Sequence, residues 1–270
     1  MTLNILISTI DEGIYKVKNV ILEYREDVSY IVSHQFTSKE FRVIPPELNR
    51  SDITVSQIQG YGVTKSRNNA INLANGDIGL FSDDDVTYTN EYFNEIINTF
   101  STNLQIDITL FKIKTPEGFP VYKNYPKDRL KIKKLPFSVG TIEIAFKINK
   151  IKDSKIKFDE RFGAGQKLLI GSDENIFILD CIKSGLNVWF IPEFIVNHPF
   201  ESTIKSLLKY DRRRVSVSGA LDARINGISA IPRAIKESIR LTPDLIKNKK
   251  NPFTYMYERL SAAIFIIRTN

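Results

Sequence analysis

Three adjacent carboxylates, Asp83, Asp84 and Asp85, directly follow a short apolar run at residues 77–82. Three neighbouring carboxylates repel one another unless a cation or solvent relieves them. Ligands of open α/β sheets bind at the carboxyl ends of the strands. Alternate residues of an extended chain project to the same side, so Asp83 and Asp85 can converge while Asp84 points elsewhere. The triad therefore indicates a site for a hard divalent ion, magnesium or manganese. The alternative is a solvated acidic turn or a helix N-cap.

A second segment of interest, residues 161–177, places a glycine-marked loop before two carboxylates. The glycines are Gly163, Gly165 and Gly171. The carboxylates, Asp173 and Glu174, begin a run with helical spacing. A carboxylate in such a place can act as a general base. It is also favourable at a helix N-terminus on electrostatic grounds, so helix capping stays open as an alternative.

The elements expected around these residues alternate between strands and helices. Strand-like runs lie at 4–9, 28–33, 53–56, 77–82, 106–113, 139–148 and 188–191, and helical spacing occurs at 65–74, 90–100 and 173–184. This alternation is typical of an α/β protein with a mostly parallel sheet. Beyond Pro199 the spacing is helical throughout. We therefore predict an α/β catalytic domain over residues 1–200 and a basic helical region over 201–270, which packs on the core or on a membrane.

Composition excludes several classes of protein. The chain has 270 residues, 42% of them hydrophobic and 11% aromatic, so it is neither disordered, collagen-like nor a coiled coil. One Cys and two His allow neither an internal disulfide nor a Cys/His zinc cluster. Residues 1–10 do not resemble a secretory signal, and no apolar stretch is long enough to span a membrane. We expect a cytoplasmic protein, with peripheral attachment to the inner face of the cytoplasmic membrane left open.

The net charge of +7 is distributed unevenly along the chain. The net charge is −7 over residues 1–111, +9 over 112–157, −3 over 158–200 and +8 over 201–270. The last region holds basic clusters at Lys205 to Arg214 and at Lys247 to Lys250. Acidic stretches suit a cation site, whereas basic stretches suit an anionic acceptor or membrane surface, or are solvated faces.

An ordered set of residues resembles the donor half of family 2 glycosyltransferases with the GT-A fold. A predicted helix carries the pair Arg67-Asn68, stops at Ala74-Asn-Gly-Asp and leads into the strand that ends in the Asp triad. The opening Ile5-Leu-Ile-Ser-Thr-Ile-Asp-Glu-Gly is similar to the family's first strand and nucleotide-base loop. The resemblance covers residues 3–200. It implies a Rossmann-like GT-A sheet and an inverting, metal-dependent transfer of a sugar from a nucleotide-sugar, most simply a UDP-sugar.

The resemblance also implies a role for each matching residue. The residues expected at the donor are Thr9, Asp11, Glu12, Lys65, Arg67, Asp83 and Asp84, those expected at the metal are Asp85, Asp83 and His198, and those of the acceptor loop are Gly163, Gly165 and Gly171. Glu174 occupies the position of the catalytic base, but the order Asp-Glu replaces the family's Glu-Asp, so Asp173 stays an alternative. His34 stands where the family often has an Asp for the nucleobase, which leaves base selection open. The implied acceptor is a saccharide or lipid-linked saccharide of bacterial capsule or cell-envelope assembly.

Two other classes of function match the sequence less well. A nucleotidyltransferase on a related fold needs a Gly-rich loop with Arg or Lys after the first strand, where this chain has Ser8-Thr-Ile-Asp-Glu-Gly. A nucleic-acid-binding protein could use the basic segments, but the chain matches no common nucleic-acid-binding motif. We therefore expect no nucleic acid as partner. Peripheral membrane contact through residues 201–270 is left open.

Overall fold

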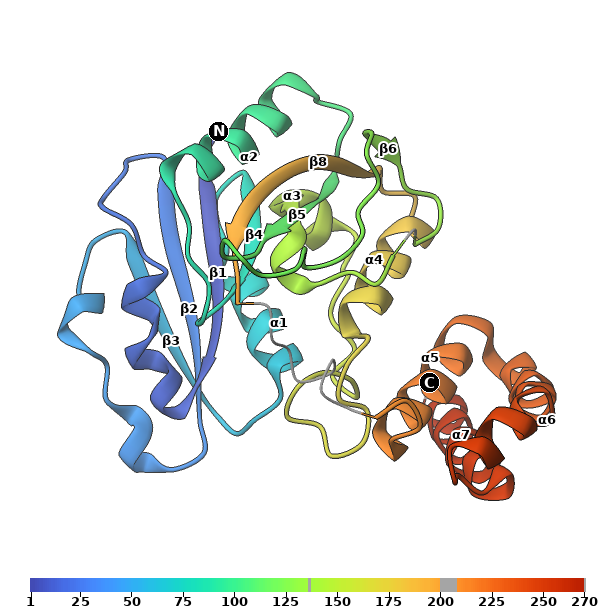
Figure 1. Cartoon of the computed structure of the whole chain (residues 1–270). Coiled ribbons are helices and arrows are strands. Elements are labelled where there is room, and N and C mark those ends of the chain that lie inside the picture. Colours follow the sequence, from blue (N-terminus) through green and yellow to red (C-terminus); the bar gives the residue numbers. More distant parts are fainter. Residues whose placement is uncertain (136, 200–207, 270) are drawn as a thin grey trace. The chain divides into compact units, whose positions relative to one another are not determined.

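The computed structural model describes residues 1–135, 137–199 and 208–269 (Figure 1). The chain divides into two compact units. Unit 1 comprises Met1–Phe158 and Phe177–Phe200, and unit 2 comprises Asp159–Ile176 and Glu201–Asn270. Each unit is described by itself. None of the described helices is long and apolar enough to cross a membrane.

Unit 1 is built on an eight-stranded sheet with the order β3-β2-β1-β4-β7-β5-β8-β6. The strands are β1 (Leu3–Ile10), β2 (Val28–Phe36), β3 (Ile53–Gln59), β4 (Ile78–Asp83), β5 (Ile108–Lys114), β6 (Leu130–Lys131), β7 (Ile144–Lys147) and β8 (Val188–Asn197). The strands β1 to β4 are parallel, and β5 is parallel to β8. β7 runs antiparallel to β4 and β5, and β6 is antiparallel to β8. The carboxyl ends of strands β1 to β4 therefore lie together at one side of the sheet, which we call the strand-end edge.

Apolar residues cover both faces of this sheet. In β1, Ile5 and Ile7 belong to one buried cluster, while Leu6 belongs to the other. Successive side chains of a strand point to opposite faces, so a strand buried on both sides needs a continuous apolar run. That is why the runs at 4–9 and 77–82 could be identified as strands from sequence.

Helices on the two faces complete the layers of unit 1. They are α1 (Val63–Leu73), α2 (Asn90–Thr102), α3 (Ile148–Asp153) and α4 (Asp173–Lys183), which continues into unit 1 from unit 2. In α2, Phe93 and Ile96 are fully buried in the first cluster, whereas Ala70 and Ile71 of α1 lie in the second. α1 and α2 therefore cover opposite faces of the sheet.

The prediction of an α/β protein with a central sheet and a helical C-terminal region is confirmed. The strand predicted over 139–148 is instead a 3-10 turn, η5 (Thr141–Glu143), followed by β7 and the start of α3. The sequence also did not reveal the short 3-10 helices η1 (Asp11–Tyr15), η2 (Val17–Asn19), η3 (Lys39–Arg42) and η4 (Pro46–Leu48). Single turns bury few side chains, so they leave little periodicity to detect.

Unit 2 consists mainly of three helices, drawn in orange and red in Figure 1. They are α5 (Arg212–Asn226), α6 (Ala230–Lys247) and α7 (Pro252–Arg268), with η6 (Gly227–Ser229) between the first two. Side-chain caps begin two of them. Asp211 accepts from the backbone N of Arg213 at 2.9 Å, and Asn251 accepts from that of Phe253 at 2.8 Å. Lys205 of the basic cluster lies outside the described residues.

The segment 159–176 folds with these helices. Its apolar side chains Phe162, Leu169 and Ile176 share a buried cluster with alanines of α5 and α7, including Ala220 and Ala263. The structure therefore groups this segment with residues 201–270, whereas the sequence-based division at residue 200 grouped it with the catalytic domain. Local spacing carries no information about which distant helix an apolar loop will pack against.

Candidate functional site

The Asp triad lies at the edge where the parallel strands of unit 1 end. Asp83 is the last residue of β4 and pairs in register with Ser8 of β1. The chain then turns, and a two-residue bridge pairs Thr87 with Asn197 at the end of β8 through backbone hydrogen bonds of 3.1 and 3.0 Å. The residue after Asn197 is His198. This bridge brings the triad and the histidine together from positions more than a hundred residues apart.

Asp85 and His198 face each other across a short gap. Asp85 Oδ1 lies 3.6 Å from His198 Nε2, and the Asp85 side chain is 51% exposed. His198 Nδ1 is hydrogen-bonded to the Pro199 carbonyl, which can only accept, so we assign the ring proton to Nδ1. In the neutral tautomer with this proton, Nε2 turns a lone pair toward the carboxylate.

This pair fits a divalent cation. A carboxylate and an imidazole nitrogen that face one place can both coordinate a cation, and a histidine that donates its other ring N–H to a backbone carbonyl is typical of metal ligands. Among the described residues, no group of three or more His, Cys, Asp or Glu side chains is arranged to hold a metal. Asp85 and His198 would thus supply two ligands, which suits an ion that keeps waters and binds phosphate oxygens.

A buried arginine stands beside the first residue of the triad. Arg67 of α1 is 5% exposed, and its Nη2 lies 3.3 Å from Asp83 Oδ1. Its guanidinium carbon lies 5.5 Å from the centre of the Phe158 ring. The neighbouring Asn68 donates to the Phe158 carbonyl at 3.0 Å and accepts from the Phe158 N–H at 2.8 Å. Both members of the Arg-Asn pair therefore hold Phe158, and Arg67 presents a fixed positive charge next to Asp83.

The central carboxylate of the triad points to a different neighbour. Thr9 Oγ1 donates to Asp84 Oδ2 at 2.5 Å. Burial raises the pKa of Asp84, and the hydrogen bond from Thr9 opposes that rise only in part. Gly13 allows this approach, because a Cβ there would lie within 2.5 Å of Thr9 Oγ1 and closer still to Asp84 Oδ2. Asp84 and Thr9 thus tie the triad loop to the end of β1.

Asp11 and His34 brace the loops next to the triad. The Asp11 carboxylate accepts from the backbone N of Thr37 at 2.7 Å and from its hydroxyl at 2.9 Å. Fully buried His34 has Nε2 3.0 Å from the Asp11 carbonyl and Nδ1 3.2 Å from Gln57 Nε2. Burial lowers the pKa of His34, which favours the neutral ring that both contacts require. Asp11 therefore engages Thr37 where the sequence predicted a base or ribose contact.

Comparison with known proteins finds one matching family model. Residues 38–162 match the family model described as glycosyl transferase family 2. Over this segment the chain is similar to family 2 glycosyltransferases. This segment contains the Arg67-Asn68 pair and the Asp triad, so the family assignment covers the core of the site just described.

Solved structures show the same fold. S. aureus TarS 1–349 in complex with UDP-GlcNAc has 15% sequence identity and a TM-score of 0.61, over 86% of this chain and 70% of that chain. The same protein in complex with UDP has 15% identity and a TM-score of 0.59, over 86% and 69% of the two chains. The GT-A fold implied by the resemblance is thus confirmed. No curated protein sequence matches the chain.

The two remaining residues that the sequence analysis assigned to the donor are exposed. Glu12 lies in η1, and Lys65 lies in the first turn of α1 after Gly62, whose φ of 108° favours glycine. Both side chains are exposed. Of the predicted donor residues, Thr9, Arg67, Asp83 and Asp84 are thus bound to one another in pairs, whereas Glu12 and Lys65 are not held in this way.

A buried polar cluster in unit 1 was missed by sequence reasoning. Fully buried Glu143 accepts from Lys123 Nζ at 3.0 Å and from the Gly140 N–H at 2.7 Å, and it is also hydrogen-bonded to the Tyr125 hydroxyl. Burial raises the pKa of Glu143, while the Lys123 ammonium opposes that rise. The adjacent Tyr122 ring lies edge-on to His198, with the ring centres 5.5 Å apart. A single acidic residue within the apolar run Ile142–Phe146 was the signal that could have found this cluster.

The predicted acceptor loop belongs to unit 2. Gly163 and Gly165 have φ values of 103° and 92°, which side chains disfavour, and the Gly163 N–H donates to the Leu169 carbonyl at 2.8 Å. Gly171 is buried. At the start of α4, Asp173 is only 2% exposed, whereas Glu174 is partly exposed. Solvent and ligands therefore reach Glu174 more readily than Asp173.

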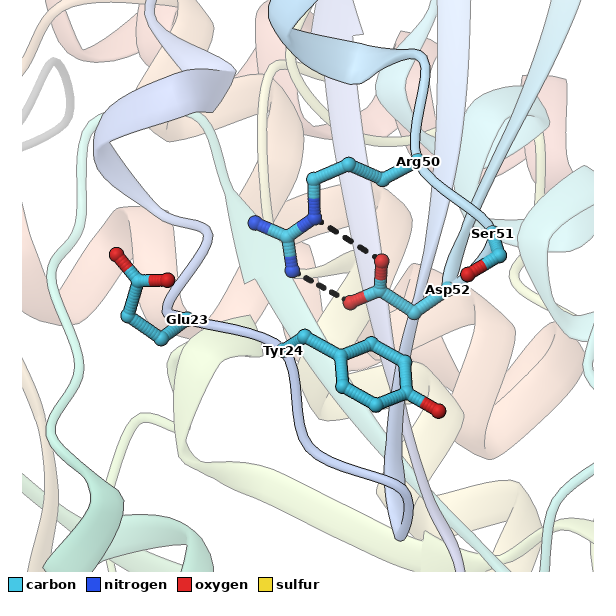
Figure 2. Close-up of a pocket in the computed structure, with 5 residues that line it drawn as sticks. All are labelled: Glu23, Tyr24, Arg50, Ser51 and Asp52. Atoms are coloured by element: carbon cyan, nitrogen blue, oxygen red, sulfur yellow. Dashed lines mark hydrogen bonds and ion pairs between the residues drawn. The ribbon is translucent and has the colours of Figure 1, made fainter.

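A hollow of about 360 Å³ lies at the edge where strands β2 and β3 begin, opposite the strand-end edge. Figure 2 shows its lining residues Glu23, Tyr24, Arg50, Ser51 and Asp52, which precede β2 and β3. Arg50 donates two hydrogen bonds to the Asp52 carboxylate, at 3.0 and 2.6 Å, and one to the Leu22 carbonyl at 3.0 Å. The charges of Arg50 and Asp52 are thus matched to each other, so we assign this pair a structural role.

Proposed function

We propose that this chain is an inverting, metal-dependent glycosyltransferase that moves a sugar from a UDP-sugar to a hydroxyl of a saccharide or lipid-linked saccharide. The observation that carries the proposal is the convergence of Asp85 and His198 at 3.6 Å, beside the Arg67–Asp83 pair, at the strand-end edge of a family 2 domain. The crystal structures of the similarly folded S. aureus TarS with UDP-GlcNAc and with UDP support a uridine nucleotide as the donor class.

Residues of the strand-end edge would hold the nucleoside diphosphate. Asp85 and His198 would ligate the manganese or magnesium ion, which when bound neutralises the charge that develops on the leaving diphosphate. Arg67 adds a guanidinium that is preorganised by Phe158 and Asn68. Asp83, partly exposed beside it, is assigned to the ribose side of the nucleotide and to the metal, as the family resemblance implies.

Glu174 is the proposed catalytic base. It accepts the proton of the acceptor hydroxyl while the oxygen forms a bond to the anomeric carbon and the bond to the diphosphate oxygen breaks, which inverts the anomeric centre. Partial exposure favours Glu174 over the buried Asp173, because the base must reach an incoming hydroxyl. Positive-φ Gly163 and Gly165 give the preceding loop the shape assigned to acceptor binding.

The proposed setting is the assembly of a bacterial surface polysaccharide. A lipid-linked acceptor would place the reaction at the inner face of the cytoplasmic membrane, and the positively charged region 201–270 suits such a surface. A nucleotidyltransferase is less well supported, since η1 after β1 begins with Asp11 and Glu12 and has no Arg or Lys.

A thermal-shift screen tests the donor class. The chain is heated with UDP-, GDP-, CMP- and dTDP-sugars, each with and without manganese. A ligand that binds only the folded state raises the Tm. We expect manganese-dependent stabilisation by UDP-sugars above the other three classes. Equal shifts with every nucleotide, or a UDP-sugar shift that chelator leaves unchanged, would reject the donor or the metal part of the proposal, respectively.

A further inference from the structure

Helix α6 of unit 2 has a buried face made mostly of small residues. Ala234, Ser238 and Leu245 are at most 3% exposed and recur at helical spacing. This face accounts for the packing of α6 within unit 2. Ala230 is also buried and Leu241 is partly buried against a second cluster, whereas other α6 side chains are exposed.

A row of isoleucines runs along another side of α6. Ile235, Ile239 and Ile246 are 39%, 68% and 64% exposed, and Ile228 in η6, two turns before Ile235, is 74% exposed. Residues at these spacings share one side of a helix. Between Ile235 and Ile246 the row extends for about 16 Å along the axis of α6. A row of this length is unusual on a surface that meets only water.

A basic side chain follows each of the three isoleucines of α6. Lys236, Arg240 and Lys247 are all exposed and form a second row, one residue further round the helix. The two acidic side chains on this part of α6 are already paired within unit 2. Glu237 holds Arg240 at 2.5 Å, and Asp244 holds Lys209 at 2.6 Å. The surface beside the isoleucine row is therefore positive.

This combination matches the chemistry of an anionic lipid surface. A helix lying in a membrane interface inserts an apolar stripe among the acyl chains and places Lys and Arg at the head groups. Each basic residue near an anionic leaflet adds to the attraction. We propose that α6 docks unit 2 on an anionic membrane through Ile235, Ile239 and Ile246, with Lys236 and Lys247 on lipid phosphates.

The docking proposal rests on the proposed function, because it specifies which residues make the membrane contact proposed there. It does not depend on the sugar-transfer chemistry, because none of its residues belongs to the proposed donor, metal or base sites. The two can therefore fail separately, and a donor-binding measurement on each variant distinguishes the failures.

Vesicle co-sedimentation of the full chain tests the docking. Vesicles are made of phosphatidylcholine alone or with added phosphatidylglycerol. We expect binding to the anionic vesicles only, weakening as salt rises. The triple variant I235S/I239S/I246S should lose about tenfold or more in affinity, and K236E/K247E a similar amount. The matched control V43S/L104S/F119S changes exposed apolar side chains of unit 1 and should bind as the wild type does.

Three results would overturn the docking. The first is unchanged binding by both α6 variants, or equal loss by the control. The second is concentration-dependent self-association without lipid that the isoleucine triple abolishes, which would assign the row to a second copy of the chain. The third is a lowered Tm of the triple with unaltered lipid binding, which would assign it to packing within the chain. A manganese-dependent Tm shift with UDP, retained in every variant, shows that the donor site is intact throughout.

Discussion

The two edges of the central sheet both carry carboxylates but hold them in opposite ways. At the edge where the strands begin, Asp52 receives hydrogen bonds of 3.0 and 2.6 Å from Arg50 and is nearly inaccessible (Figure 2). At the edge where the strands end, Asp85 is half exposed and faces Nε2 of His198. The first carboxylate is neutralised by an arginine of the same chain, whereas the second lies half exposed beside a histidine.

The difference can be seen in the sequence. At the first edge, an arginine stands two residues before the aspartate, as in Arg25–Asp27 and Arg50–Asp52, and forms a bidentate fork. No basic residue lies within two positions of Asp83, Asp84 or Asp85. An arginine two positions before an aspartate therefore predicts the structural pairs at the first edge, and the triad lacks such a neighbour. Asp173 and Glu174 also lack such a neighbour.

The largest expected effect separates the two candidate bases. Glu174→Gln should lower kcat by about 10²- to 10⁴-fold, because it removes the proton acceptor and keeps the size of the side chain. Donor binding should not change. Asp173→Asn is the matched control, measured by steady-state turnover and by the Tm shift with UDP. A greater kcat loss in Asp173→Asn at unchanged Tm would transfer the role to Asp173.

The next prediction concerns Asp85, the half-exposed carboxylate at the strand-end edge. Asp85→Asn should lower turnover by about 10²- to 10³-fold, as expected when one preorganised electrostatic contact to the leaving group is lost. It should leave the Tm of the unliganded chain near the wild-type value, because Asp85 is half exposed. The paired variant Asp52→Ala at the other edge should keep its turnover. If Asp52→Ala reduced turnover as much as Asp85→Asn, the contrast between the edges would be broken.

Asp52, whose carboxylate is paired with Arg50, should contribute to stability and not to turnover. Asp52→Ala leaves the Arg50 guanidinium without its carboxylate and should cost about 1–3 kcal/mol in the free energy of unfolding. Denaturant unfolding measures this cost. R50M/D52L, which removes both charges, should recover part of it. An Asp52→Ala variant as stable as the wild type would show that the fork is not a stabilising element.

Gly13 offers a smaller test on the strand-end edge. Gly13→Ala places a methyl group against Asp84 and Thr9, so one of them must move. We expect a severalfold rise in KM for the donor, since the triad loop loses its tie to β1. Gly140→Ala is the control, because its added Cβ would meet its neighbours at ordinary contact distances of 3.6 Å. Equal KM values for both variants would argue against a positioning role for Gly13.

The smallest effect concerns the pairing of Asp159 with Arg161 and Arg224 in unit 2, and the pH dependence of this pairing. Burial raises the pKa of Asp159, but hydrogen bonds from Arg161 and Arg224 outweigh this and hold the pKa below its ordinary value of 3.8. The stability from this fork is therefore fully present above pH 3.8 and is lost as the pH falls toward the lower folded-state pKa. Asp159→Asn should lose stability less steeply in this acidic range. Parallel acid-unfolding curves for the two proteins would contradict this.

The fold was largely predictable because its strands are buried on both faces. The apolar runs at 4–9 and 77–82 identify β1 and β4 to within two residues at either end. The antiparallel insertion of β7 between β4 and β5 was not predictable, since pairing depends on distant partners. The packing of residues 159–176 with the C-terminal helices escaped sequence reasoning for the same reason.

The site was predictable in its residue types more than in its contacts. The spacing of the triad and the family resemblance pointed to Asp85 and His198, which the Thr87–Asn197 bridge brings face to face. The hydrogen bonds of Asp11 to Thr37 and of Asp84 to Thr9 depend on side-chain directions that no linear pattern specifies. Glu143 required knowledge of its burial, which only the folded chain provides.

The central claim is that the strand-end edge holds a divalent cation through Asp85. Electron paramagnetic resonance of free manganese measures this directly, because bound ions lose the sharp signal of the hexaaqua ion. With UDP present, the wild type and Asp52→Ala should deplete free manganese with one site per chain, and Asp85→Asn should not. Equal depletion by Asp85→Asn and the wild type would contradict the account.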